Sequence, residues 1–174
     1  MSGNGFNGVI LRVNLTTGQT STEALADRDT RMFLGGRGLG AALLYREVSP
    51  QTDPLGEDNK LIFVTGPLTG TAAPGSSKYV VMTKSPLTNI YLMSVSSRYF
   101  GVHLKKAGFD VLIVEGKAAS PVYLHITDNR VEIKDAGQVW GMTTDRTDWF
   151  LKEQLHDAQL KVACIGPAGE NGVL

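Results

Sequence analysis

A run of glycine, serine and lysine between two strand-like segments could bind a phosphate. Residues 70–78 read GTAAPGSSK and come close to a phosphate loop, which has the pattern G-x4-G-K-[ST]. Lys78 stands two positions too late, and the strand-like run YVVMT follows where a helix should begin. The sequence therefore argues against a nucleotide triphosphatase. The backbone N–H groups around Gly75, the hydroxyls of Ser76 and Ser77 and the charge of Lys78 can still cradle an anion or a cofactor.

A second group of serines precedes an expected helix. Residues 96–107 predict this helix, because apolar side chains recur on one side of it and Gly108 stands just past its end. Ser96 and Ser97 are good N-cap residues, and the same geometry would turn free N–H groups and the positive helix dipole toward an anion. Arg98 would strengthen such a site. The alternative is a capped surface helix without a ligand.

A third glycine cluster, GRGLGA at residues 36–41, satisfies the loose dinucleotide pattern G-x-G-x-x-A. That chemistry needs a buried strand directly before the glycines. Residues 27–34 carry several charges and predict a short helix instead. Glycines that allow close backbone packing explain the motif equally well.

Metal-binding and nucleophilic side chains are few. The chain has one cysteine, Cys164, and its three histidines, His103, His125 and His156, are too far apart for a short metal motif. The pattern for a disulfide, a zinc site or an iron–sulfur cluster is therefore missing. No Ser/His/Asp or Cys/His set has supporting spacing. Cys164 lies in an apolar run, which predicts a buried structural thiol.

Composition excludes several broad classes of function. Lys plus Arg and Asp plus Glu each number 17, so bulk charge gives no argument for a nucleic acid or an anionic membrane as partner. No apolar run approaches the roughly 18 residues that a membrane-spanning helix needs. Residues 1–14 lack the pattern of a secretory signal. With 42% apolar residues, the 174 residues predict a single folded domain over residues 1–174.

Short strand-like runs and hairpin turns are interspersed with about three helices. This arrangement predicts an α+β fold with mixed, largely antiparallel sheets. Residues 60–67 (KLIFVTGP) and 161–167 (KVACIGP) share a strand-then-Gly-Pro pattern, which is compatible with an internal duplication or with a chance match. The glycine-rich residues 166–172 predict a loop, and such an ending is compatible with the front part of a longer chain.

Nine segments along the chain form a collinear series: FNGVILRVNLTTG (6–18), FLGGRGLG (33–40), LLYREVSP (43–50), DPLGEDNKLIF (53–63), TGPLTGTAAP (65–74), TKSPLT (83–88), YFG (99–101), KKAGFD (105–110) and IGPAGEN (165–171). Together they closely resemble the N-terminal domain of the aldehyde ferredoxin oxidoreductase family. The resemblance extends over essentially all 174 residues and is far more specific than any of the glycine motifs.

The resemblance implies a saddle-like α+β base on which a bis-pterin cofactor sits. Family members are oxygen-sensitive cytoplasmic enzymes of anaerobic metabolism that oxidise aldehydes to carboxylic acids. They use tungsten, or in some members molybdenum, held as tungstopterin or molybdopterin with a bridging magnesium, and pass electrons to ferredoxin or an iron–sulfur electron-transfer subunit. Later domains carry the 4Fe-4S cluster and the acid–base residues, which fits the single cysteine here. A homodimer is compatible with the resemblance.

The resemblance also assigns cofactor binding to particular positions: Gly75, Ser76, Ser77, Lys78, Ser96, Ser97 and Arg98. Lys78 takes the place of an arginine that contacts the pterin, so the charge is kept but the planar fork is lost. Val95 and Ser97 take the places of an asparagine and a glycine that contact the cofactor or its magnesium. Arg98 replaces a further glycine.

Two hypotheses follow. In the first, the chain is the pterin-cradling domain of a tungsten- or molybdenum-dependent aldehyde oxidoreductase and is inactive alone. In the second, it is a non-catalytic relative that kept the fold, lost the cofactor site and acts as an interaction or assembly subunit. Val95, Ser97 and Arg98 favour the second hypothesis, whereas the intact residues 33–40 and 65–74 favour the first.

Overall fold

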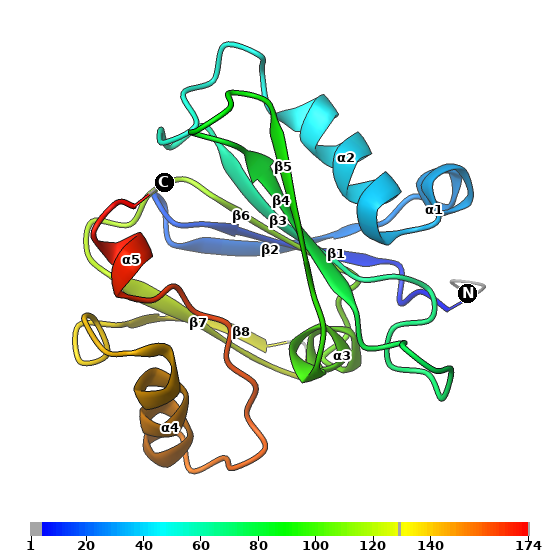
Figure 1. Ribbon diagram of the computed structural model, residues 1–174. Coiled ribbons are helices and arrows are strands. Elements are labelled where there is room, and N and C mark those ends of the chain that lie inside the picture. The colour runs from blue at the N-terminus through cyan, green and yellow to red at the C-terminus, as the bar shows by residue number, and fades with distance from the viewer. Residues whose placement is uncertain (1–4, 129, 174) are drawn as a thin grey trace.

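The computed structural model describes residues 5–128 and 130–173 and has an α+β fold (Figure 1). Its strands are β1 (Val9–Asn14), β2 (Gln19–Ala24), β3 (Lys60–Val64), β4 (Tyr79–Lys84), β5 (Tyr91–Ser96), β6 (Val111–Glu115), β7 (Val122–Thr127) and β8 (Arg130–Asp135). Its helices are α1 (Asp27–Phe33), α2 (Gly36–Glu47), α3 (Tyr99–Lys106), α4 (Thr144–Gln154) and α5 (Pro167–Glu170). Asn129 in the β7–β8 turn, the first four residues of the N-terminal segment and Leu174 lie outside the described residues.

Six strands form one mixed sheet in the order β2-β1-β6-β3-β4-β5. Among them β1 and β6 run parallel, and the other neighbours run antiparallel. Strands β7 and β8 form a separate antiparallel hairpin. The predicted mixed, largely antiparallel architecture is therefore confirmed. Within the described residues no helix is both long and apolar enough to cross a membrane.

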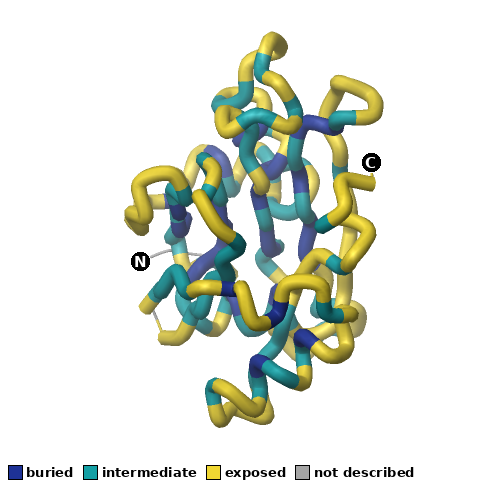
Figure 2. Tube along the Cα trace, turned by 90° about the vertical axis from the view of Figure 1, so that its left-hand side faces the viewer, coloured by how far each residue is buried: buried dark blue, intermediate teal, exposed yellow. Residues whose placement is uncertain are grey.

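Helices α1 and α2 cover one face of the six-stranded sheet (Figure 1). Side chains alternate along each strand, so every second residue of β1, β3 and β6 points to this face. Ile10, Ile62 and Ile113 are buried there against Leu39 and Leu43 of α2. Figure 2 shows the buried segments along the central strands, with exposed loops around them.

The opposite face of the sheet is covered by α3 and the β7–β8 hairpin. Leu11 and Leu112 of the sheet are buried there with Leu104 of α3 and Phe109, and apolar residues of the hairpin pack against them. The other face of the hairpin packs against α4, where Leu151 is buried in a third, smaller core. The molecule is thus layered, with helices, sheet, hairpin and a further helix in succession.

Three local predictions near the C-terminus are wrong. Residues 161–165 form no strand, because an apolar run becomes a strand only where a neighbour can pair with it, and no described strand pairs with this one. Cys164 is consequently exposed, not buried. The Gly-Pro pattern of residues 60–67 therefore marks no repeated element at residues 161–167. The one-turn helix α5 occupies part of the predicted glycine loop.

Candidate cofactor-binding surface

The residues predicted to bind a cofactor lie on two segments that meet at one end of β4 and β5. These strands are antiparallel, with Tyr79 opposite Ser96. Lys78 directly precedes Tyr79, while Ser97 and Arg98 directly follow Ser96, so both segments end at the same edge of the sheet. Residues 75–78 and 96–98 are all exposed or half-buried, and together they form one surface.

The loop that carries Lys78 is held from the inside by Thr69. The Thr69 hydroxyl is buried, accepts a hydrogen bond from the Gly66 N–H at 2.9 Å and donates to the Lys78 carbonyl at 3.0 Å. One side chain therefore joins the start and the end of the loop. The Lys78 side chain stays free to face solvent because only its backbone is used.

A second pair of bonds shapes the tip of this loop. The Gly70 N–H donates to the Ser76 carbonyl at 2.9 Å, and the Ser76 hydroxyl donates to the Thr71 carbonyl at 2.7 Å. Gly75 has φ +74°, and no atom lies within 4 Å of the position that a Cβ would take there. The outer side of the tip is thus open, and a bound group could approach the backbone closely.

Helix α3 begins later than the sequence predicts. Ser96 is the last residue of β5, and the helix starts at Tyr99 with Arg98 as its N-cap. No side chain caps this end of the helix, so the predicted serine caps are wrong. Arg98 has φ +76° and ψ −153°, a backbone region that is essentially restricted to glycine. The backbone of Arg98 adopts this conformation because only two residues connect the end of β5 to the start of α3.

Positive charge gathers at this surface. Lys78 and Arg98 are exposed, and neither forms an ion pair with any described residue. Lys161 lies 5.5 Å from the centre of an aromatic ring in the first turn of α3. Burial, together with the positive charges of Lys161 and Lys106, lowers the pKa of His103 on the same helix. Such a field favours an anionic group such as a phosphate.

A buried ion pair, which the sequence motifs did not single out, supports the start of the loop. Lys105 donates to the Gly66 carbonyl, and its Nζ lies 3.7 Å from Asp110 Oδ1. Asp110 is fully buried, and its Oδ2 accepts the Gly8 N–H at 2.6 Å. Burial lowers the pKa of Lys105, and the negative charge of Asp110 opposes this shift. In the sequence, this ion pair could have been recognised from the five-residue spacing of the two charges around an Ala-Gly-Phe turn in residues 105–110.

The two nucleotide-like motifs lack the structural context that nucleotide chemistry needs, as predicted. Helix α1, not a strand, precedes the glycines of residues 36–41. A Cβ on Gly40 would lie 2.5 Å from Met82 Sδ, so this glycine lets α2 approach β4. Residues 70–78 lead into β4 and not into a helix. These glycines therefore serve packing and loop geometry.

Side-chain metal sites are also missing from the described part of the chain. No group of three or more His, Cys, Asp or Glu residues there could hold a metal ion. What the surface offers is backbone N–H groups, four serine hydroxyls and two cations. Such a donor set suits the phosphate and ring edges of an organic cofactor.

Comparison with known proteins identifies the family. The domain described as "Aldehyde ferredoxin oxidoreductase, N-terminal domain" matches residues 10–174. The chain belongs to the aldehyde ferredoxin oxidoreductase family. The tungsten-containing aldehyde ferredoxin oxidoreductase of Pyrococcus abyssi is 51% identical to it over 169 residues, which cover 97% of this chain and 28% of that protein. The enzyme of the same name from Pyrococcus furiosus is 46% identical over 164 residues, 94% of this chain and 27% of that protein.

Other relatives of this aldehyde ferredoxin oxidoreductase family domain carry different names. The aliphatic sulfonate oxidoreductase, WOR-like subunit, of Pyrococcus furiosus is 39% identical over 183 residues, 97% of this chain and 29% of that protein. A chain of the active site complex BamBC of benzoyl coenzyme A reductase, solved with 1,5-dienoyl-CoA, superposes with a TM-score of 0.94 at 38% identity. That match covers 97% of this chain and 26% of the other. The chain therefore spans little more than a quarter of these relatives.

Proposed function

We propose that the chain is the pterin-cradling domain of a tungsten- or molybdenum-dependent enzyme that oxidises aldehydes to carboxylic acids, and that it forms the front part of a longer chain. The proposal rests on one observation above all. In a domain of this family, residues 75–78 and 96–98 meet at an open, positively charged surface next to the uncapped start of α3.

The residues present fit a pterin with its phosphate. Lys78 and Arg98 can each make a charge-assisted hydrogen bond to a phosphate oxygen, and Arg98 can do so with two parallel donors. Backbone N–H groups around Gly75 and the hydroxyls of Ser76 and Ser77 can meet the ring edges. Ser96 and Ser97 would contribute from the opposite side of the same cradle.

Val95 offers no ligand for the magnesium ion that the resemblance implies. Its side chain is 48% exposed near the end of β5. The guanidinium of Arg98 stands three positions further along the chain and can supply positive charge at the phosphates instead. This domain would thus hold the phosphates by side-chain charge more than by a metal bridge.

When bound, the pterin carries tungsten or molybdenum, which supplies the two-electron chemistry. The residues of this chain would bind and orient the cofactor and take no part in proton transfer. Under the proposal, the rest of the enzyme provides the 4Fe-4S cluster and the contact with ferredoxin or an iron–sulfur subunit, in the cytoplasm. The domain by itself would have no turnover.

Removal of either cation should weaken cofactor retention in the full-length, anaerobically purified enzyme. Each lost charge-assisted hydrogen bond is worth about 1.5–3 kcal/mol, so Lys78→Ala and Arg98→Ala should each reduce the pterin and metal retained after dialysis about tenfold or more. Metal analysis and the fluorescence of the oxidised pterin measure both contents directly.

Lys117→Ala is the matched control, because Lys117 is an exposed cation that follows β6 and lies outside the proposed cradle. Its cofactor content should equal that of the parent protein. Full-length protein that contains neither tungsten, molybdenum nor pterin would overturn the proposal and favour the non-catalytic assembly subunit.

A further inference from the structure

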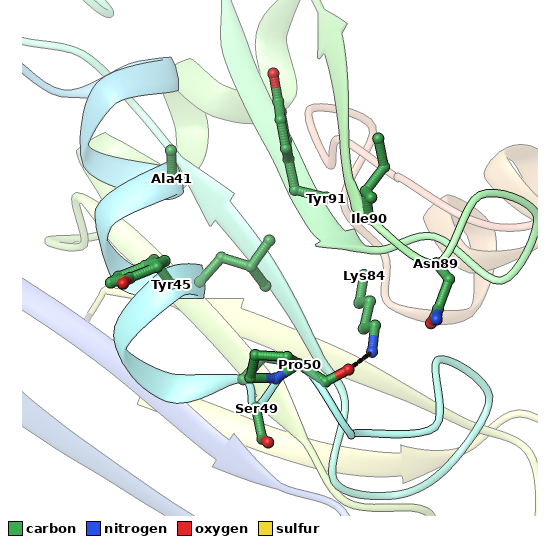
Figure 3. Close-up of a pocket in the computed structure, with 10 residues that line it drawn as sticks. Ala41, Tyr45, Ser49, Pro50, Lys84, Asn89, Ile90 and Tyr91 are labelled. Atoms are coloured by element: carbon green, nitrogen blue, oxygen red, sulfur yellow. Dashed lines mark hydrogen bonds between the residues drawn. The ribbon is translucent and has the colours of Figure 1, made fainter.

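A cavity lies at the end of β4 and β5 opposite to the cofactor surface, between α2 and the turn that joins these strands (Figure 3). Its volume is about 400 Å³, within the range of small-molecule sites. Its walls are mostly apolar and include Leu44, Tyr45, Val48, Pro50, Ile90 and Tyr91. At about 3.4 Å per residue, the six residues of β4 separate the cavity from the cofactor surface by roughly 20 Å.

Lys84 is the cationic residue in this mostly apolar lining. Its side chain is buried, at 6% exposure, and extends toward Pro50 between α2 and the start of β5 (Figure 3). Its ammonium donates to the Pro50 carbonyl at 2.6 Å and to the Thr52 carbonyl at 2.8 Å. An ammonium has three N–H donors, so one of them has no acceptor among the described residues.

The charge of Lys84 also has no counter-ion in the described part of the chain, where no carboxylate oxygen lies within 4.0 Å of its Nζ. Burying a charge without a partner is unfavourable, and lysines are seldom buried this way. The remaining N–H and the missing negative charge are both features that an anionic ligand would supply.

The buried ammonium of Lys84 is not needed to hold the loop that precedes β3 against β4. Asn59 already ties that loop to β4, since its amide donates to the Pro54 carbonyl at 2.7 Å and to the Lys84 carbonyl at 3.1 Å. Its Oδ1 also accepts the Lys84 N–H at 3.3 Å. The backbone of Lys84 is therefore held without the ammonium.

We propose that this cavity binds a small monocarboxylate with an aromatic body. The carboxylate would sit at the Lys84 ammonium, with the Asn89 amide as a second polar partner at the rim. Tyr45 and Tyr91, which are 89% and 60% exposed, flank the cavity from α2 and β5 and would pack against the ring of the ligand. The site is separate from the cofactor surface, so it stands or falls independently of cofactor binding.

Phenylacetate and its neutral isostere phenylacetamide test the proposal on the full-length protein. Saturation-transfer difference NMR and calorimetry should show saturable binding of phenylacetate at least tenfold tighter than that of phenylacetamide. The difference reports the interaction of the carboxylate with a cation, because the two probes share shape and apolar surface. Lys84→Met should remove this preference and leave two equally weak ligands.

A second variant keeps the test valid if Lys84→Met does not fold. Ala41 is exposed and lines the cavity from α2, so Ala41→Phe should fill the cavity while Lys84 itself is left in place. This variant should weaken phenylacetate binding at least tenfold. Ala158→Phe adds the same ring at an exposed position outside the cavity and should leave the affinity unchanged.

Three results would overturn the proposal. The first is equal affinity of the parent protein for both probes, and the second is an unchanged affinity in Ala41→Phe. The third is a lack of saturable phenylacetate binding. This result is expected if an acidic side chain from another polypeptide segment already occupies the cavity and pairs with the lysine.

Discussion

Arg98 combines an unusual backbone conformation with a positive charge at the candidate cofactor-binding surface. Its φ of +76° and ψ of −153° lie where a side chain is strained, and such strain amounts to about 1–3 kcal/mol. The conformation directs the chain from β5 into α3, and Arg98 thereby lies at the edge of the proposed cradle. A charged side chain in a glycine-like conformation is consistent with a role in binding, and stability alone would favour glycine.

Glycine and alanine at position 98 separate the strain from the charge. Arg98→Gly removes both, so it should raise the free energy of unfolding by about 1 kcal/mol because a glycine adopts this conformation freely. Arg98→Ala removes only the charge and should leave the stability within about 0.5 kcal/mol of the parent. Urea unfolding followed by tryptophan fluorescence measures both values. Equal stabilities of the glycine and alanine variants would show that the backbone at this position is not strained.

At the scale of the elements, helices α2 and α3 approach the sheet through single glycines. Gly40 of α2 faces Met82, and a Cβ on Gly101 of α3 would lie 2.8 Å from Tyr79 Cβ. Tyr79 is itself buried. Its ring stacks on Phe63 at 6.4 Å and meets Phe100 in a tilted arrangement at 5.2 Å between ring centres. The contact therefore fixes the start of α3 relative to β4, and with it the geometry of the cofactor surface.

Gly101→Ala should destabilise the protein, although alanine normally stabilises a helix by about 1 kcal/mol relative to glycine. The new methyl group would meet the Cβ of Tyr79, which cannot move without its strand, and overpacking of this kind costs about 1–3 kcal/mol. The urea concentration at the midpoint of unfolding should fall accordingly.

Gly137→Ala is the control for this prediction. A Cβ there would meet only the end of the flexible Asp135 side chain, at 3.1 Å, so the stability should change by no more than about 0.5 kcal/mol. An unchanged or higher midpoint for Gly101→Ala would mean that α3 is not seated against β4 as described.

At the scale of the whole molecule, a network of charges joins four strands, β1, β2, β3 and β6, to the end of α2. Arg12 of β1 contacts Glu47 at 2.8 Å and Glu115 at 3.2 Å, and it also reaches Glu23 at 2.7 Å. Lys60 of β3 contacts Glu115 and lies 3.4 Å from Glu47. Because all of these groups except the exposed Glu23 are half-buried and share partners, the network is expected to contribute more than an isolated surface ion pair.

The network predicts a loss of stability in acid. Burial alone would raise the pKa of Glu47 and of Glu115, but the hydrogen bonds and charges of Arg12 and Lys60 outweigh burial and lower both. A lowered pKa in the folded state stabilises the protein above the unfolded glutamate value of about 4.3. This contribution should be constant near neutral pH and should be lost as the pH falls through the lowered values.

Glu115→Gln tests this expectation. At pH 7 it should reduce the free energy of unfolding by about 2 kcal/mol, since it removes charged hydrogen bonds to Lys60 and Arg12. Near pH 2 the variant and the parent should converge. Glu153→Gln, at an exposed position of α4, should have no effect at either pH. A deficit of Glu115→Gln that is equally large at both pH values would contradict the assignment.

The two proposed sites lie at opposite ends of the same pair of strands, and the sequence pointed to only one of them. Residues 75–78 and 96–98 were recognisable because glycine, serine and cations cluster within short segments. The cavity at Lys84 combines α2, the following loop and the β4–β5 turn, so no local pattern could indicate it. A lysine within an alternating strand looks like a solvent-facing residue, and only the packing of the loop over it makes it buried.

The sequence by itself determined the fold class and most strands, because period-two alternation and turn residues are local properties. The family was recognisable from the nine collinear motifs and not from periodicity. It also predicted correctly that the glycines of residues 36–41 follow a helix. Tertiary structure decided what depends on neighbours. Residues 161–165 found no strand to pair with, Ser96 was taken into β5 by its register with Tyr79, and Cys164 was left exposed. The burial of Asp110 and Lys84 likewise follows from segments distant in sequence that close over them.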